Sequence, residues 1–286
     1  MKVVLFCGGL GMRLREFSET IPKPMVNIGH RPILWHVMKY YAHYGHNEFI
    51  LCLGHKGDLI KDYFLNYKET VSNDFVLSEG GRKVELLNSD IHDWRITFVN
   101  TGLTSNIGQR LKAAEHYLEG QEVFLANYTD LLSDLPLPDL IHFFTKHDKI
   151  ASFISVPPTQ SFHLVSLIDG GLVKSIKHVS EAGVRINGGF FVFKKQIFDY
   201  IKNSEELVYE PFQRLIEEKQ LIAYEHDGFW ACMDTFKERQ LLEDMYTRGE
   251  TPWEVWKPNS GTHGTPTCRN QTGQILSKLD NVKNGR

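Results

Sequence analysis

The sequence has few cysteines and no long apolar run. Four cysteines in 286 residues stand far apart, without a CxxC pair, so neither a disulfide framework nor a zinc site of the usual spacing is expected. No stretch approaches the ~20 apolar residues of a membrane-spanning helix, and the apolar run after Met1 is too short for the core of a signal peptide. We therefore expect buried free thiols, a cytoplasmic location and no membrane partner.

An excess of charge of one sign is also absent. The chain has 32 lysines and arginines against 35 aspartates and glutamates, a net charge of −3. A nucleic-acid-binding domain usually presents a basic face or stripe, and no such run is visible, so no nucleic-acid partner is expected. The composition, 42% hydrophobic and 23% charged, is that of a soluble globular protein.

The common signatures of nucleotide-binding loops are missing, but a different glycine-rich loop is present. Neither a Walker A pattern nor GxGxxG occurs. Instead, residues 8–14 read GGLGMRL directly after an apolar strand. Gly8, Gly9 and Gly11 allow backbone N–H groups to approach a phosphate closely, and Arg13 adds a cation. Further along, Lys23 stands between two prolines that stiffen the backbone around it. Together these features indicate a site for a polyphosphate.

The first half of the chain alternates short apolar runs with helical patterns, which is typical of βαβ units and a mostly parallel sheet. The predicted strands are 3–7, 48–53, 96–99 and 122–126, and the predicted helices are 33–44, 58–66 and 109–118. This pattern predicts an α/β fold with a doubly wound, mostly parallel, Rossmann-like sheet.

The pattern changes after residue 150. Short strands at 151–156, 164–168, 173–178 and 189–193 are separated by turns, which predicts a mixed or antiparallel extension of the sheet; a helix at 210–218, a strand at 221–225 and a helix at 236–248 follow. We expect one domain over residues 1–256, with a nucleotide-binding half (1–150) and an acceptor-binding half (151–256). Residues 257–286 are polar and are expected to form a flexible tail.

Several ordered motifs carry a resemblance to a known family. They are the glycine-rich loop, PKPM at 22–25, IGHRPILWH at 28–36, Thr101-Gly102, GQRLK at 108–112, INGGFF at 186–191 and GFWACMDT at 228–235. The chain resembles the sugar-1-phosphate nucleotidyltransferases, and within them the cytidylyltransferase branch, over nearly everything except the tail. The resemblance implies transfer of a nucleotide from CTP to a phosphorylated acceptor, release of pyrophosphate, and a place in sugar-nucleotide and polysaccharide biosynthesis.

The resemblance also implies roles for individual residues. Arg13 and Lys23 would be catalytic, and the nucleotide site would comprise Gly8, Gly9, Gly11, Met12, Arg13, Lys23, Ser105 and Arg110. The acceptor site would comprise Tyr128, His163, His178 and Asn187, and the protein would be a homo-oligomer. From the residues alone, Asn187 reads equally as a turn residue before two glycines.

Two aspartates are candidates for a Mg²⁺ site. Asp130 follows a predicted strand, where open α/β sheets bind their ligands, and Mg²⁺ takes oxygen ligands, commonly one or two carboxylates with phosphate oxygens. Asp234 stands before a predicted helix, so on position alone it is either a metal ligand or the helix N-cap. The resemblance favours the metal, because the family's two metal-binding aspartates match Asp130 and Asp234.

Three positions depart from the family pattern, and all concern the acceptor. Thr129 and His163 replace glycines, and His178 takes the place of a lysine that holds the sugar phosphate. A histidine with a pKa near ~6.5 carries only part of a charge at neutral pH. The sequence is therefore compatible with two kinds of acceptor: glucose-1-phosphate, or a different phosphorylated molecule that need not be a sugar.

Two further alternatives remain. The same chemistry with another nucleoside triphosphate would use different base contacts, which the sequence does not locate. A non-catalytic, nucleotide-binding regulatory subunit is a different class of protein. Such a subunit would be expected to lose Arg13, Lys23 or one of the two aspartates, and all four are present.

Overall fold

The side chains of strand β1 (Val3–Phe6) alternate between two buried faces of a central sheet. In the computed structural model, which describes residues 1–9, 21–159 and 162–257, Val3 and Leu5 pack into one apolar cluster, and Val4 and Phe6 pack into another. A strand buried on both faces is expected in the middle of a sheet covered by helices on each side.

The central sheet has the order β13-β10-β14-β8-β1-β4-β7, with β15 beside β10. Strands β8, β1, β4 and β7 are parallel to one another, whereas β14 runs antiparallel to both β8 and β10. The strands of this sheet are β1 (Val3–Phe6), β4 (Glu48–Leu53), β7 (Arg95–Asn100), β8 (Val123–Tyr128), β10 (Ala151–Val156), β13 (Ile186–Asn187), β14 (Phe191–Lys194) and β15 (Leu221–Glu225). The predicted parallel sheet with an antiparallel extension is confirmed.

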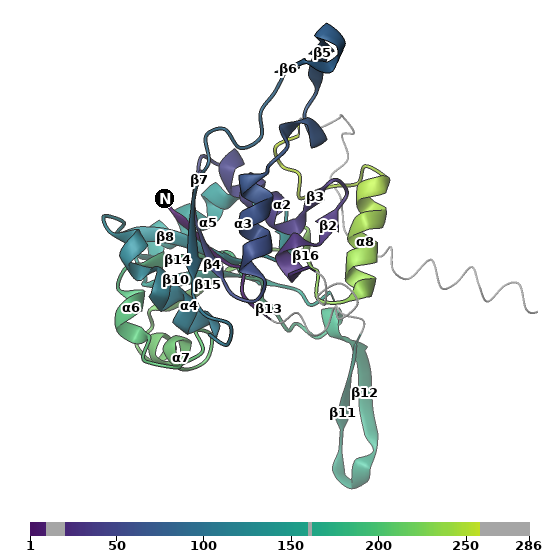
Figure 1. Cartoon of the computed structure of the whole chain (residues 1–286). Helices are drawn as coiled ribbons and strands as arrows, with labels where there is room; N and C mark the ends of the chain where they lie inside the picture. The colour runs from purple at the N-terminus through teal and green to yellow at the C-terminus, as the bar shows by residue number, and fades with distance from the viewer. Residues whose placement is uncertain (10–20, 160–161, 258–286) are drawn as a thin grey trace, which may run out of the picture. The chain divides into compact units, whose positions relative to one another are not determined.

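Helices cover both faces of this sheet (Figure 1). The cluster around Leu5 includes side chains of α2 (Ile33–His43), α3 (Gly57–Leu65), α5 (Leu137–His147) and α8 (Phe236–Thr247). The cluster around Phe6 includes side chains of α4 (Ile107–Ala114), α6 (Ile197–Tyr200) and α7 (Glu210–Glu217). This is the doubly wound arrangement that the sequence predicts.

The parallel strands bring their carboxyl ends to one edge of the sheet. Gly8 follows β1, Gly54 follows β4, Thr101 follows β7 and Asp130 follows β8. Strand β8 runs to Tyr128, two residues beyond its predicted end, so Asp130 stands immediately outside the sheet. Open α/β sheets bind ligands at this edge.

A short ladder outside the central sheet joins two distant parts of the chain. Strand β9 (Leu131–Ser133) pairs antiparallel with β16 (Trp230–Cys232), with Leu131 opposite Cys232. The ladder is extended by a hydrogen bond from Met233 N to Asp130 O, 2.9 Å long. Because Asp130 precedes β9 and Asp234 follows Met233, this ladder places the two aspartates side by side.

Two hairpins stand apart from the sheet in Figure 1, and both expose apolar side chains. They are formed by β5 (Phe75–Ser78) with β6 (Lys83–Leu86), and by β11 (His163–Leu167) with β12 (Val173–His178). The remaining short elements are β2 (Asn27–Ile28), β3 (Arg31–Pro32), η2 (Lys23–Met25), η3 (Glu69–Val71), η4 (Glu79–Gly81), η5 (Glu115–Leu118), η6 (Asp169–Gly171) and η7 (Val179–Glu181).

Residues Met1–Trp256 form one compact unit. Within the part of the chain that the structure describes, Cys7, Cys52 and Cys232 are buried free thiols, and no helix is both long and apolar enough to cross a membrane. The strand predicted at 189–193 begins instead at Phe191, because Gly189 and Phe190 both have positive φ and form a turn.

We expect Leu5→Ala to lower the free energy of unfolding by about 2–5 kcal/mol, because the substitution leaves a cavity in a fully buried strand. Leu65→Ala is the matched control, since the Leu65 side chain is 80% exposed, and its effect should stay within about 0.5 kcal/mol. Urea unfolding measures both values. Equal effects would mean that Leu5 does not lie in the core.

Candidate active site at the carboxyl ends of the strands

The ammonium group of Lys23 joins the two aspartates. Lys23 begins the short helix η2, with Pro22 before it and Pro24 after it. Its Nζ donates a hydrogen bond to Asp130 Oδ2 at 2.5 Å and a second one to Asp234 Oδ1. Two carboxylates that are far apart in the sequence therefore converge on a single cation beside the first strand.

The two carboxylates keep Lys23 charged. Burial acts to lower the pKa of Lys23, but Asp130 and Asp234 outweigh burial and raise this pKa above its usual value. Since a raised pKa favours the protonated form, the ammonium persists throughout the neutral range. The stabilisation from this pairing is fully present near neutral pH and is lost only as the pH rises through the raised pKa of the folded state.

Asp234 does not cap helix α8. The N-cap is Thr235, whose hydroxyl accepts from Glu238 N, and the Glu238 side chain reaches back in a capping box. Glu238 Oε2 also accepts from Asp234 N at 2.8 Å. The alternative that Asp234 serves as the N-cap is therefore wrong: the neighbouring threonine has that task, and the Asp234 carboxylate points to Lys23.

A cavity of about 90 Å³ lies against Lys23 and Asp130. Several of the residues that the sequence predicts for nucleotide and acceptor binding line this cavity. Its lining residues are Phe6, Cys7, Gly8, Gly9, Lys23, Pro24, Ile107, Tyr128, Thr129 and Asp130. The structure thus gathers the described part of the glycine-rich loop, the lysine and one aspartate around one space.

Arg110 lies against Gly8, the first residue of the glycine-rich loop. Its side chain is buried, and Nη1 donates to Thr101 Oγ1 at 2.6 Å and to Gly102 O at 3.1 Å. A Cβ on Gly8 would lie 2.0 Å from the guanidinium carbon, and one on Gly54 would lie 2.8 Å from Nη1. Burial lowers the pKa of Arg110, but a guanidinium stays protonated in proteins. Gly8 and Gly54 therefore both lie against a positive charge.

Gly54 is a site residue that the sequence analysis missed. It follows β4 as Gly8 follows β1, and both lie against the same guanidinium. The signal was available, because a glycine directly after a predicted parallel strand marks a place where the backbone must approach another group closely.

Other predicted nucleotide-binding residues differ in position. Ser105 is half-buried beside Arg110, and its hydroxyl donates to Thr101 O. Gly11, Met12 and Arg13 lie outside the described residues. Their predicted roles stay predictions.

The predicted acceptor residues occupy three places. Tyr128 lines the cavity beside Asp130. Asn187 is exposed at the end of β13, and its Oδ1 accepts from Gly189 N at 2.9 Å. The side-chain oxygen of Asn187 is therefore used within the turn, as expected for a turn residue. His163 and His178 stand opposite each other on the β11–β12 hairpin, with ring centroids 5.5 Å apart. The two histidines thus form a pair on a different element from Lys23 and Asp130.

Neither thiol near the site is a reactive nucleophile. Burial raises the pKa of Cys7 well above its usual value. Burial, followed by the nearby carboxylates of Glu238, Asp234 and Asp130, raises the pKa of Cys232 to about 12. Because the thiolate is the nucleophilic form of cysteine, both side chains are inert at neutral pH.

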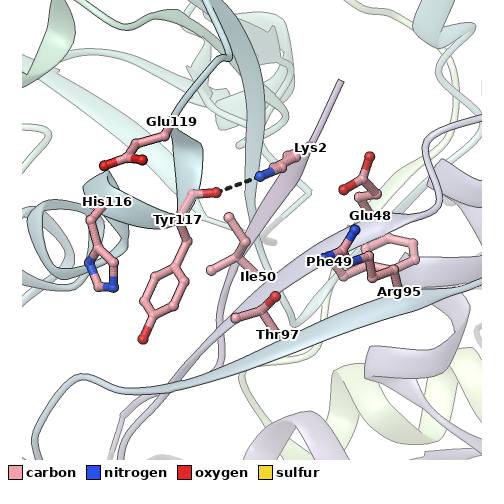
Figure 2. Close-up of a pocket in the computed structure, with 9 residues that line it drawn as sticks. All are labelled: Lys2, Glu48, Phe49, Ile50, Arg95, Thr97, His116, Tyr117 and Glu119. Atoms are coloured by element: carbon pink, nitrogen blue, oxygen red, sulfur yellow. Dashed lines mark hydrogen bonds between the residues drawn. The ribbon is translucent and has the colours of Figure 1, made fainter.

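A second cavity, of about 300 Å³, lies at the opposite edge of the sheet (Figure 2). Its lining includes Lys2, before β1, and Glu48, Arg95 and Glu119, and Lys2 Nζ donates to Tyr117 O at 2.7 Å. None of the predicted site residues lines it. Since Lys2 and Glu48 stand at the amino ends of their strands, this cavity is separate from the site around Lys23.

We expect Gly8→Ala to lower the free energy of unfolding by about 1–3 kcal/mol, because the new Cβ overlaps the Arg110 guanidinium. The same substitution in an Arg110→Ala background should cost clearly less, since the group that it meets has been removed. Urea unfolding of the two single variants and the double variant gives the coupling. Strict additivity would contradict this packing.

Solved structures share the fold of this chain. A UDP-glucose pyrophosphorylase complexed with UDP-glucose matches with a TM-score of 0.63 and 18% identity, covering 87% of this chain and 98% of the other. HddC from Yersinia pseudotuberculosis matches with a TM-score of 0.60 and 22% identity, covering 86% and 99%. At these identities the likeness concerns the fold alone.

Sequence comparisons extend over most of the chain. A glucose-1-phosphate cytidylyltransferase of Salmonella typhi is 39% identical over 259 residues, which are 90% of this chain and 100% of that protein. A mannose-1-phosphate guanyltransferase of Saccharomyces cerevisiae is 26% identical over 254 residues, 85% of this chain and 63% of that protein. The sequence profile of the family described as nucleotidyl transferase matches residues 2–245. This chain therefore belongs to the nucleotidyl transferase family.

Proposed function

We propose that the protein transfers CMP from CTP to glucose-1-phosphate, giving CDP-glucose and pyrophosphate. The choice of CTP and glucose-1-phosphate is supported by a relative of that name that is 39% identical over its whole length. The observation that carries the chemistry is the convergence of Asp130 and Asp234 on Lys23 beside the glycine-rich loop. A polyphosphate substrate needs this combination of cation and metal-binding carboxylates.

The two aspartates fit a Mg²⁺ ion. Their carboxylates already meet at a cation, the Lys23 ammonium, and hard carboxylate oxygens are the protein ligands that Mg²⁺ prefers. Asp130 and Asp234 would hold the ion, and when bound it would supply positive charge that offsets the charge developing on the phosphates.

The residues of the chain supply positioning and charge. Backbone N–H groups of Gly8 and Gly9 and the side chains of Arg13 and Lys23 would hold the triphosphate. An oxygen of the acceptor phosphate attacks the α-phosphorus in line, and the bond from that phosphorus to the pyrophosphate oxygen breaks. A phosphate monoester is a nucleophile at neutral pH, so the reaction requires no general base and no covalent intermediate on the enzyme. The buried thiols of Cys7 and Cys232 have no part in it.

The proposed acceptor residues would receive glucose-1-phosphate or a related phosphorylated molecule. Tyr128 lies beside Asp130, and the His163–His178 pair would bring two imidazoles to the acceptor phosphate where the family has a lysine. Glucose-1-phosphate is favoured by the named relative, and a changed acceptor is the second candidate because of this pair.

A homo-oligomer is also proposed, with a second copy of this chain on the exposed apolar hairpins. On β11–β12 the cross-strand neighbours Val165 and Ile176 are 53% and 61% exposed. On β5–β6 the neighbours Leu77 and Val84 are 59% and 50% exposed. Exposed apolar surface on this scale marks a protein contact in soluble proteins. The open strand edges of the hairpins also favour such a contact, because uncovered edges can pair with strands of other molecules.

We expect the wild-type protein to release pyrophosphate from CTP and glucose-1-phosphate when Mg²⁺ is present, and to stop when EDTA is added. Asp130→Asn and Asp234→Asn should each lower kcat by about 100-fold or more, because each removes one carboxylate charge from the site of phosphate binding. A pyrophosphate-coupled assay measures the rates.

Controls in this assay separate the alternatives. Asp148→Asn, on the surface after α5, should keep the wild-type rate. Turnover with CTP and only with acceptors other than glucose-1-phosphate would favour the changed acceptor. Turnover with another NTP in place of CTP would mean that the enzyme recognises a different base. No release with any pair of substrates would favour the regulatory subunit.

We expect the wild-type protein to sediment as an oligomer and the Val165→Lys/Ile176→Lys variant to sediment as a smaller species, because two charges on one face of the hairpin repel a second copy. Leu65→Lys is the control, since Leu65 is 80% exposed outside both hairpins. Analytical ultracentrifugation gives the masses. A wild-type monomer would overturn the oligomer proposal.

A further inference from the structure

Asn187 is the first residue of a strained turn. In residues 187–190, Gly189 has a φ of +74° and Phe190 has a φ of +52°. A positive φ is costly for a phenylalanine and persists only where the surroundings hold it. The Phe190 ring is buried and packs edge-on against the ring of Tyr40, with centroids 5.3 Å apart. Residues outside the turn must therefore fix its backbone.

Asn127 holds one side of this turn. It is fully buried on β8, and its Oδ1 accepts from Phe190 N and from Tyr128 N, both at 2.9 Å. The turn lies so close that a Cβ on Gly189 would be 2.6 Å from this oxygen. Asn127 stands three residues before Asp130, so the hydrogen bond joins the turn to the strand of the first aspartate.

Trp230 holds the other side. Its indole Nε1 donates to Gly188 O at 2.9 Å, and the residue is buried on β16. Trp230 stands four residues before Asp234, at the start of the strand that leads to the second aspartate. The turn is thus bonded on each side to a strand that ends at a carboxylate.

Backbone pairing holds the turn only on its β10 side, where Gly188 N donates to Ile154 O at 2.8 Å and Ile154 N donates to Gly189 O at 3.1 Å; among the described residues, the β8 side lacks such bonds. The β8–β14 ladder has its last pair at Ala126 and Phe191, and the turn lies beyond it. The side chain of Asn127 replaces the missing backbone partner for Phe190 N. A buried asparagine costs free energy unless its hydrogen bonds are made, and an apolar residue would serve general stability at least as well. Its presence points to a geometric requirement.

We propose that Asn127 and Trp230 are positioning residues that hold the 187–190 turn, and with it Asn187, in register with Asp130 and Asp234. The proposal rests on the proposed function, because Asn187 is taken to face the acceptor. The two side chains form a brace between the acceptor side of the site and the two carboxylates. Loosening the brace moves the acceptor relative to the α-phosphate and leaves the glycine-rich loop untouched.

The kinetic test compares KM values for the two substrates. Asn127→Leu has nearly the shape of asparagine without its acceptor oxygen, and Trp230→Phe lacks the indole N–H. In each, the KM for glucose-1-phosphate should rise about tenfold, equivalent to about 1.4 kcal/mol, while the KM for CTP stays within about twofold. Asn127→Asp keeps an oxygen acceptor and should recover part of the loss.

Hydrogen exchange of residues 187–191 gives a second readout that needs no turnover. The Phe190 amide should exchange faster in Asn127→Leu than in the wild-type protein, because its acceptor is gone. Val192→Ala is the control for general destabilisation: Val192 is buried on β14 next to the turn, so this variant should lower stability without splitting the two KM values.

The outcomes separate the two proposals. Equal rises in both KM values, or unchanged values together with unchanged exchange of Phe190, overturn the brace. A wild-type protein without turnover overturns the proposed function, and exchange at Phe190 and at Gly189 then decides whether Asn127 and Trp230 hold the turn. If Asn127→Leu does not fold, Trp230→Phe carries the same test.

Discussion

The structure depends on holding two carboxylates against one ammonium group. Two like charges a few ångströms apart repel by several kcal/mol at the effective dielectric of a protein surface, so Asp130 and Asp234 need a cation between them. Lys23 provides it in the free protein. The β9–β16 ladder and the bond from Asp234 N to Glu238 keep the carboxylates in place whichever cation is present. The fold thus accepts electrostatic repulsion at one point and holds the two carboxylates there with backbone and capping hydrogen bonds.

Side-chain hydrogen bonds also hold other parts of the backbone around the site. The central sheet brings its strands to one edge, but its regular hydrogen bonds end there, and side chains take over. Thr129 Oγ1 donates to Phe6 O at 3.0 Å and ties β8 to β1, while Asn127 and Trp230 tie the turn before β14 to the two aspartates. Thr129, which departs from the family pattern, therefore has a structural use: its hydroxyl joins the end of β1 to the segment that carries Asp130.

Local sequence patterns predicted the regular elements well and the long-range contacts poorly. The strands at 48–53, 151–156 and 221–225 have the predicted limits, because each is an apolar run between turn residues. The β9–β16 ladder was missed, because its short strands lie far apart in the chain and neither has a period of its own. The β5–β6 hairpin was missed because its apolar side chains face solvent. The convergence of Asp130 and Asp234 was predicted from the family resemblance. The role of Asn127 was not predicted, although a polar asparagine next to an apolar strand is a visible signal.

The buried Arg110 links substrate binding to the folding equilibrium. Among the residues that the structure describes, this guanidinium has hydroxyl and carbonyl partners but no carboxylate, and a buried charge without a counter-ion is costly. An anion bound beside Gly8 and this guanidinium would relieve that cost in the folded state only. Polyanionic ligands should then protect the protein against heat, and part of its thermal resistance in the cell would come from the nucleotide pool.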